Sequence, residues 1–91
     1  MSTPLSKVKN FGPETLPELE SLGLNTLEDL QDFGWEEVCR KWVESYPERL
    51  NANAFVGIIT AIEGSTWMKA TASQRAQARN FAKKLKLELK F

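Results

Sequence analysis

The sequence contains no histidine and only one cysteine, Cys39. Without histidine the chain cannot form a Ser-His-Asp triad, a histidine general base or a zinc site of the usual Cys/His type. One cysteine cannot form an intramolecular disulfide, which favours a reducing, cytoplasmic location. Cys39 shares an expected helix face with Trp42 and has no neighbouring base, so we expect a buried, unreactive thiol. We therefore predict no catalytic residue, no metal or other cofactor and no small-molecule substrate.

Net charge and long apolar runs are also absent. Twelve Lys and Arg balance twelve Asp and Glu, so the whole molecule has no general attraction to nucleic acid or anionic lipid. The longest nearly apolar run, residues 54–62, is far too short to cross a bilayer. Residues 1–7 lack the apolar core of a signal peptide. These features predict a cytoplasmic protein without a membrane partner.

The charges are distributed unevenly along the chain. Residues 1–50 contain five Lys and Arg against ten Asp and Glu, a net charge of −5. Residues 51–91 contain seven against two, a net charge of +5. The molecule is therefore a charge dipole along its sequence.

Length and hydrophobic periodicity predict the fold class. Ninety-one residues, 42% of them apolar, suffice for one small core. We expect a single all-α domain over residues 1–91, with its core at about residues 5–85. A short turn is expected at residues 5–9, after a loose N-terminal end. Apolar residues at helical spacing predict about five helices, at residues 13–22, 27–33, 35–45, 54–63 and 72–85. For the first helix a start at Leu16 is the alternative, because Pro17 removes one helix hydrogen bond near its beginning.

Several residues are typical of helix ends. Gly23 suits the left-handed cap that ends a helix. Thr26 is expected to cap the second helix, and Asn51 or Asn53 the fourth. Thr71 and Gln74 have the spacing of a capping box. Residues 84–91 alternate with period two, but a lone strand has no partner in an all-α protein, so we expect the last helix to fray into an extended end.

The apolar pattern also predicts the core. The fourth helix is apolar nearly all round, which is typical of a buried helix. We expect Phe55, Ile58 and Ile62 at its centre, and we expect Gly57 to allow a neighbouring element to approach closely. Other side chains expected to face inward are Phe11, Leu27, Leu30, Phe33, Trp35, Trp42, Trp67 and Met68.

Several short motifs follow one another between residues 5 and 85. They are Asn10-Phe-Gly-Pro13, Leu22-Gly-Leu24 and Thr26-Leu-Glu-Asp-Leu30, followed by Gly34, Asn53, Ala61, Gly64 and Trp67. Together they resemble the C-terminal domain of the TfoX/Sxy family of bacterial competence regulators. The resemblance implies a SAM-like helical bundle with a helix-hairpin-helix element. It also implies a cytoplasmic, non-enzymatic role in regulating competence genes.

The wider helix-hairpin-helix group binds DNA without sequence preference, through backbone amides that meet a phosphate. Its motif resembles apolar-x-Gly-apolar-Gly-x-Lys-Thr-Ala, with which Gly12 and Thr15 agree. Asn10 replaces the first glycine, Glu14 the lysine and Leu16 a small residue. Because an acid repels phosphate, weak binding is expected at this hairpin. A purely structural turn is the competing interpretation.

A basic stripe is predicted on the last helix. Its residues are Arg75, Arg79, Lys83 and Lys86, and Lys90 would join them if the helix continued. At about 100° per residue the four fall within about 80° of one another. The stripe is either a solvated outer face or a surface that meets phosphates or an acidic protein.

Two functions are consistent with these patterns. The first is a protein-interaction module in transcriptional or competence regulation. The second is a weak, sequence-independent DNA-binding protein, in which contact would run through the last helix rather than the hairpin. An enzyme is less favoured, because no pair of acids is placed in an evident pocket.

Overall fold

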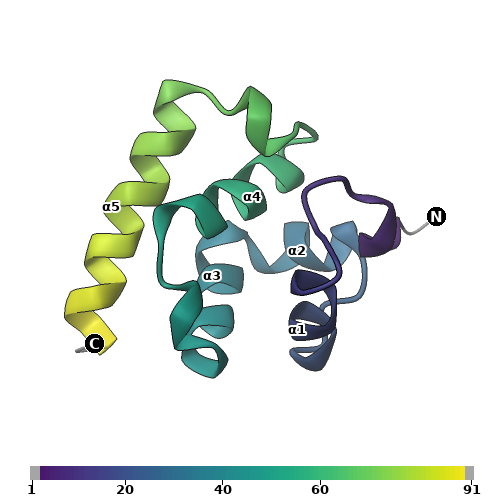
Figure 1. Cartoon of the computed structure of the whole chain (residues 1–91), viewed down its shortest axis with the longest axis horizontal. Coiled ribbons are helices and arrows are strands. Elements are labelled where there is room, and N and C mark those ends of the chain that lie inside the picture. The colour runs from purple at the N-terminus through teal and green to yellow at the C-terminus, as the bar shows by residue number, and fades with distance from the viewer. Residues whose placement is uncertain (1–2, 90–91) are drawn as a thin grey trace.

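The computed structural model describes residues 3–89, which form five α-helices and no β-strand (Figure 1). The helices are α1 (Thr15–Ser21), α2 (Leu27–Phe33), α3 (Trp35–Ser45), α4 (Ala52–Ile62) and α5 (Ala72–Leu89). Three single 3-10 turns accompany them: η1 (Leu5–Lys7), η2 (Pro47–Arg49) and η3 (Trp67–Lys69). The predicted all-α bundle is confirmed for these residues. None of their helices is both long and apolar enough to span a bilayer.

Helix α4 forms the centre of the core. Its side chains of Phe55, Ile58 and Ile59 are completely buried, and α2, α3 and α5 all pack against it. The prediction that Ile62 belongs to this centre is wrong: Ile62 is only partly buried, because it is the last residue of α4. Ile59 takes that place.

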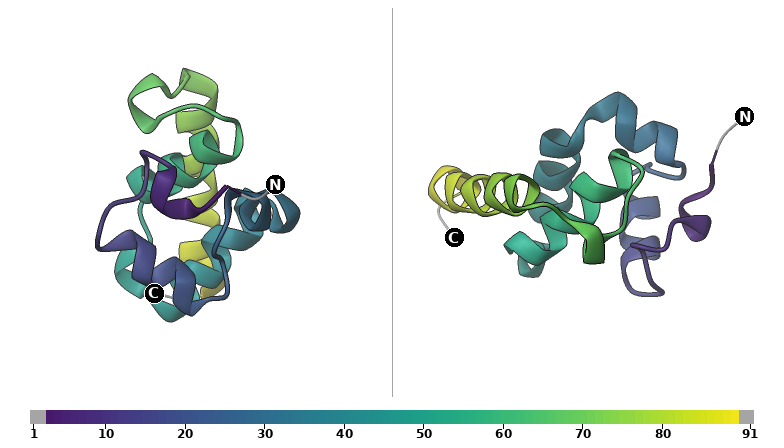
Figure 2. Two further views of the ribbon diagram at one scale, coloured as in Figure 1. Left: turned by 90° about the vertical axis from the view of Figure 1, so that its right-hand side faces the viewer. Right: turned by 90° about the horizontal axis from the view of Figure 1, so that it is seen from above.

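Helix α5 lies along one side of the molecule (Figure 1). Viewed from above, it forms one end and the N-terminal segment the other (Figure 2). Phe81 attaches α5 to the core: its ring centroid lies 5.1 Å from that of Trp35 and 5.9 Å from that of Phe55. Because only one side of α5 is packed, its other side faces solvent.

Local signals place most helix ends. Gly23 has a φ of +84°, and the Leu24 amide donates to the Leu19 carbonyl at 3.0 Å, which closes α1. Thr26 forms a capping box with Asp29 at the start of α2. Asn51 caps α4, because its Oδ1 accepts from the Ala54 amide at 2.8 Å.

Three predicted boundaries differ from the structure. Helix α1 begins at Thr15, between the two expected starts at residues 13 and 16, so Pro17 lies in the first turn, where its missing N–H has no helical partner to lose. Helix α4 begins at Ala52 rather than at residue 54, because Asn51, the earlier of the two expected capping residues, caps it. Helix α5 continues to Leu89, because Leu85 and Leu89 still pack on the core. Lys90 lies outside the described residues.

The chain before η1 is attached to α2 and is not loose at Thr3 and Pro4. The Leu27 amide donates to the Thr3 carbonyl at 2.8 Å. The Thr3 amide donates to a Glu28 carboxylate oxygen at 2.6 Å, and this bond lowers the pKa of Glu28. Leu5 is then placed in the core, almost completely buried.

Three side chains predicted to be buried are exposed: Phe33 by 48%, Trp67 by 53% and Met68 by 71%. Phe33 is the last residue of α2, and the Lys41 ammonium lies over its ring, 5.4 Å from the ring centroid. Trp67 and Met68 lie in η3, a turn that connects α4 to α5. The predicted close approach at Gly57 is also wrong, because a Cβ built there meets no heavy atom within 4 Å.

Candidate binding surface

The basic residues predicted on the last helix share one exposed face of α5, which we call the basic face. They are Arg75, Arg79, Lys83 and Lys86. Within residues 3–89 none of them forms an ion pair. Glu88, the one acid of α5, points elsewhere: it accepts from the Arg40 guanidinium at 2.6 Å and lies 4.0 Å from the Lys84 ammonium. The hydrogen bond from Arg40 lowers the pKa of Glu88. The charge of the basic face is therefore unbalanced.

The two hairpin residues lie before and at the start of α1. Gly12 is exposed, its carbonyl accepts from the Leu16 amide at 3.1 Å, and a Cβ there would meet nothing within 4 Å. The exposed Glu14 is the N-cap residue of α1 and makes no capping hydrogen bond. An anion approaching this helix start would therefore meet the Glu14 carboxylate.

A cleft of about 480 Å³ connects the hairpin with the basic face. Its buried apolar lining includes Phe11, Trp42 and Val56. Its polar lining includes the predicted residues Thr15 and Arg75. The structure thus brings together one residue from each predicted site, whereas Gly12, Arg79, Lys83 and Lys86 do not line this cleft.

Asn10 connects three segments around the cleft. Its Nδ2 donates to the Gly57 carbonyl and to the Thr60 hydroxyl, both at 3.0 Å. Its Oδ1 accepts from the Trp67 amide at 3.2 Å. One side chain thus fixes the loop before α1 against α4 and η3, which sets the positions of the cleft walls.

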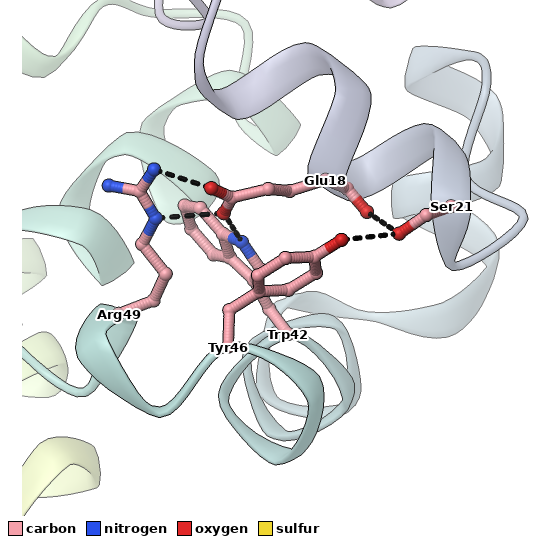
Figure 3. Close-up of polar contacts among 5 residues, drawn as sticks. All are labelled: Glu18, Ser21, Trp42, Tyr46 and Arg49. Atoms are coloured by element: carbon pink, nitrogen blue, oxygen red, sulfur yellow. Dashed lines mark hydrogen bonds and ion pairs between the residues drawn. The ribbon is translucent and has the colours of Figure 1, made fainter.

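A second polar cluster lies around Glu18 of α1 (Figure 3). The Trp42 indole N–H donates to Glu18 Oε1 at 2.7 Å. Arg49 binds the same carboxylate with two nitrogens, at 2.8 and 2.7 Å. The Ser21 hydroxyl donates to the Glu18 carbonyl at 2.6 Å and lies 2.9 Å from the Tyr46 hydroxyl. These contacts connect α1 to α3 and to η2.

The electrostatics of the cleft follow from these contacts. The hydrogen bonds from Arg49, assisted by that from Trp42, lower the pKa of Glu18. The same carboxylate raises the pKa of Arg49. Arg49 is therefore neutralised where it lines the cleft, whereas Arg75 forms no ion pair within residues 3–89. The cleft has one unbalanced positive charge.

Groups with reactive potential are engaged in structural roles. Cys39 is completely buried, and burial raises the pKa of its thiol, with a smaller effect from Glu36. The pKa of Asp29 is lowered, first by the hydrogen bond from the Asn25 amide. Among residues 3–89, no three His, Cys, Asp or Glu side chains lie close enough to hold a metal ion.

Comparison of the chain with protein-family models, curated proteins and solved structures found no match. The TfoX/Sxy resemblance therefore stays a prediction from the motifs. The geometry of the described residues is what supports a function.

Sequence reasoning missed three features of this surface. Asn10 was interpreted only as a motif position, and no structural contact was predicted for Glu18. The exposed Trp67 was assigned to the core. A usable signal existed only for Trp67, because it lies between two helices and outside any apolar period.

Proposed function

We propose that this protein is a non-enzymatic interaction module that docks an acidic segment of a protein partner. One observation carries the proposal: the exposed Trp67 lines the same cleft as Arg75, which belongs to a basic face whose charges are unpaired within residues 3–89. The exposed Met68 follows Trp67 in η3. Trp, Met and Arg are enriched in protein interfaces, and Trp and Arg are the commonest energetic anchors. Among the four residues of the basic face, Arg75 is the closest along the chain to this apolar pair.

A non-enzymatic role is supported by the state of the ionisable groups. The Cys39 thiol is buried and has a raised pKa, which opposes formation of the reactive thiolate. Glu18 and Asp29 have lowered pKa values and are held by structural hydrogen bonds, so they are poor proton donors near neutral pH. The resemblance to TfoX/Sxy adds the setting that we propose, which is cytoplasmic regulation of transcription or competence.

Weak, sequence-independent DNA binding is the second candidate function. It is supported by the four aligned cations of the basic face, which could contact successive phosphates. With zero net charge the affinity would be on the order of 10⁻⁴–10⁻⁶ M, and four phosphate contacts would give a salt slope of about −3.6. We favour the protein partner because Met68 is 71% exposed, and a thioether offers nothing to a phosphate.

The test uses fluorescence anisotropy with two probes: acidic peptides selected on the protein from a phage library of random dodecapeptides, and a short duplex DNA. We expect the peptides to bind the parent and to lose affinity at least about tenfold with Arg79→Glu/Lys83→Glu. The matched control is Lys7→Glu/Lys9→Glu, which makes the same charge change at exposed positions before α1. Equal binding by both variants would exclude the basic face. Binding of DNA alone, with the expected salt slope, would favour the second function.

A further inference from the structure

Gly57 occupies a position where glycine has no evident structural purpose. It lies in the middle of α4, where glycine is less stable than alanine. Gly57 is not among the glycines with positive φ, which are Gly23, Gly34 and Gly64. No neighbouring atom comes within 4 Å of where its Cβ would be. Neither a turn nor tight packing therefore requires it.

What Gly57 does is keep the cleft open. It is one of the cleft residues, so a side chain at this position would project into the empty space. Val56 and Asn53 belong to the same part of α4 and also line the cleft. A bulky residue at position 57 would therefore fill the cleft without disturbing the core beneath it.

The polar groups of the cleft fall into two sets. The side chains of Asn10 and Asn51 form hydrogen bonds within the fold. Within residues 3–89, the side chains of Thr15, Asn53 and Arg75 make no hydrogen bond, and all three line the cleft. An apolar floor with a few polar groups that no other side chain engages is typical of a binding site.

We propose that this cleft seats one apolar side chain of the acidic partner segment, and that Arg75 binds a neighbouring carboxylate of the same segment. The inference rests on the proposed protein-docking function and adds the anchor point to it. Arg75 supports the assignment because it belongs to both the cleft and the basic face, so one extended chain can occupy both. Charge complementarity points the same way, because the cleft has a single unbalanced cation.

A peptide fits this site better than nucleic acid does. Glu14 is exposed directly before Thr15, at the hairpin side of the cleft. A continuous run of phosphates along the basic face and cleft would approach this carboxylate. A peptide with one carboxylate near Arg75 and an apolar side chain on Phe11 and Val56 avoids that repulsion.

The experiment measures anisotropy of the selected acidic peptides on Gly57→Leu, which fills the cleft. We expect the dissociation constant to rise at least about tenfold, while the melting temperature does not fall. Ser45→Leu adds the same side chain at an exposed residue of α3 outside the cleft lining and should bind like the parent. Asn53→Leu, at an exposed cleft position of α4, is a second filling variant if Gly57→Leu does not fold.

The outcomes separate this inference from the proposed function. If both filling variants bind like the parent while Arg79→Glu/Lys83→Glu does not bind, the cleft is not the anchor and the docking function stands. If no acidic peptide binds the parent, both the docking function and the cleft assignment are refuted. If the selected peptides bind only through acidic residues, with no apolar residue at a fixed position, the anchor side chain is excluded.

Discussion

Removing the Glu18 carboxylate should destabilise the protein more than an ordinary substitution at the protein surface does. In Glu18→Ala, the indole N–H of the buried Trp42 loses its acceptor. An unsatisfied buried donor costs about 1–3 kcal/mol. The ion pair with Arg49 adds to this, because the two side chains are only 15% and 23% exposed. Such a pair lies between a surface pair, worth about 0–1 kcal/mol, and a buried pair, whose breaking costs about 3–5 kcal/mol.

We therefore expect Glu18→Ala to lower the free energy of unfolding by about 2–3 kcal/mol. For a domain of this size each kcal/mol lowers Tm by about 4–8 °C, so Tm should fall by about 10–20 °C. Urea and thermal unfolding followed by circular dichroism measure both quantities. Glu20→Ala, an exposed acid of the same helix, is the matched control. Equal losses for the two variants would refute the stabilising role of the cluster.

The pH dependence gives an independent check. The pKa of Glu18 is lowered in the folded state, so its contribution is present above the unfolded value of about 4.3 and is lost as pH falls through the folded value. The stability difference between parent and Glu18→Gln should thus be constant from neutral pH to about pH 5 and shrink in stronger acid. A difference that grows on acidification would contradict this sign.

Three further predictions concern the core and the cleft. Gly57→Ala should raise the free energy of unfolding by about 0.5–1 kcal/mol, because helix propensity improves and the Cβ meets no neighbour; a lower Tm would reveal a packing role. Ile58→Ala, at a completely buried site, should cost about 2–5 kcal/mol in urea unfolding, and an unchanged midpoint would contradict its central place. Cys39 should react with a thiol reagent only on unfolding. Because the pKa of its thiol is raised in the folded state, only the unfolded state loses this proton just above about pH 8.5, so stability should decline there. Rapid labelling of the folded protein would refute that burial.

The helices could be predicted from the sequence because their signals are local. Helix α3 has the predicted bounds, since Val38, Cys39 and Trp42 repeat at helical spacing and Gly34 precedes them. Gly23 and Thr26 mark a helix end and start through hydrogen bonds to residues at most five positions away. A six-residue window contains all the information that such caps need.

The cleft could not be predicted because distant residues build it. The partners of the Asn10 side chain lie 47, 50 and 57 positions away. Glu18 binds Trp42 and Arg49 at separations of 24 and 31. Contacts between residues so far apart leave no periodic pattern in the sequence. Trp67 was predicted in the core because an aromatic residue usually lies there, but it lies in η3, a single turn between two helices.

The same distant contacts should affect how tightly the cleft binds a peptide. Asn10 fixes its walls before any partner arrives, so a bound segment would not need to order them, which favours affinity. A ligand that binds only the folded state at one hundred times its dissociation constant stabilises that state by about 2.7 kcal/mol. The selected peptide should therefore raise Tm in the parent and, at the same concentration, by about half as much or less in Gly57→Leu, whose affinity is at least about tenfold lower. In Asn10→Ala, which frees the walls, the rise should be smaller at the same peptide concentration. A peptide-induced rise that is equal in all three proteins would show that the peptide binds elsewhere.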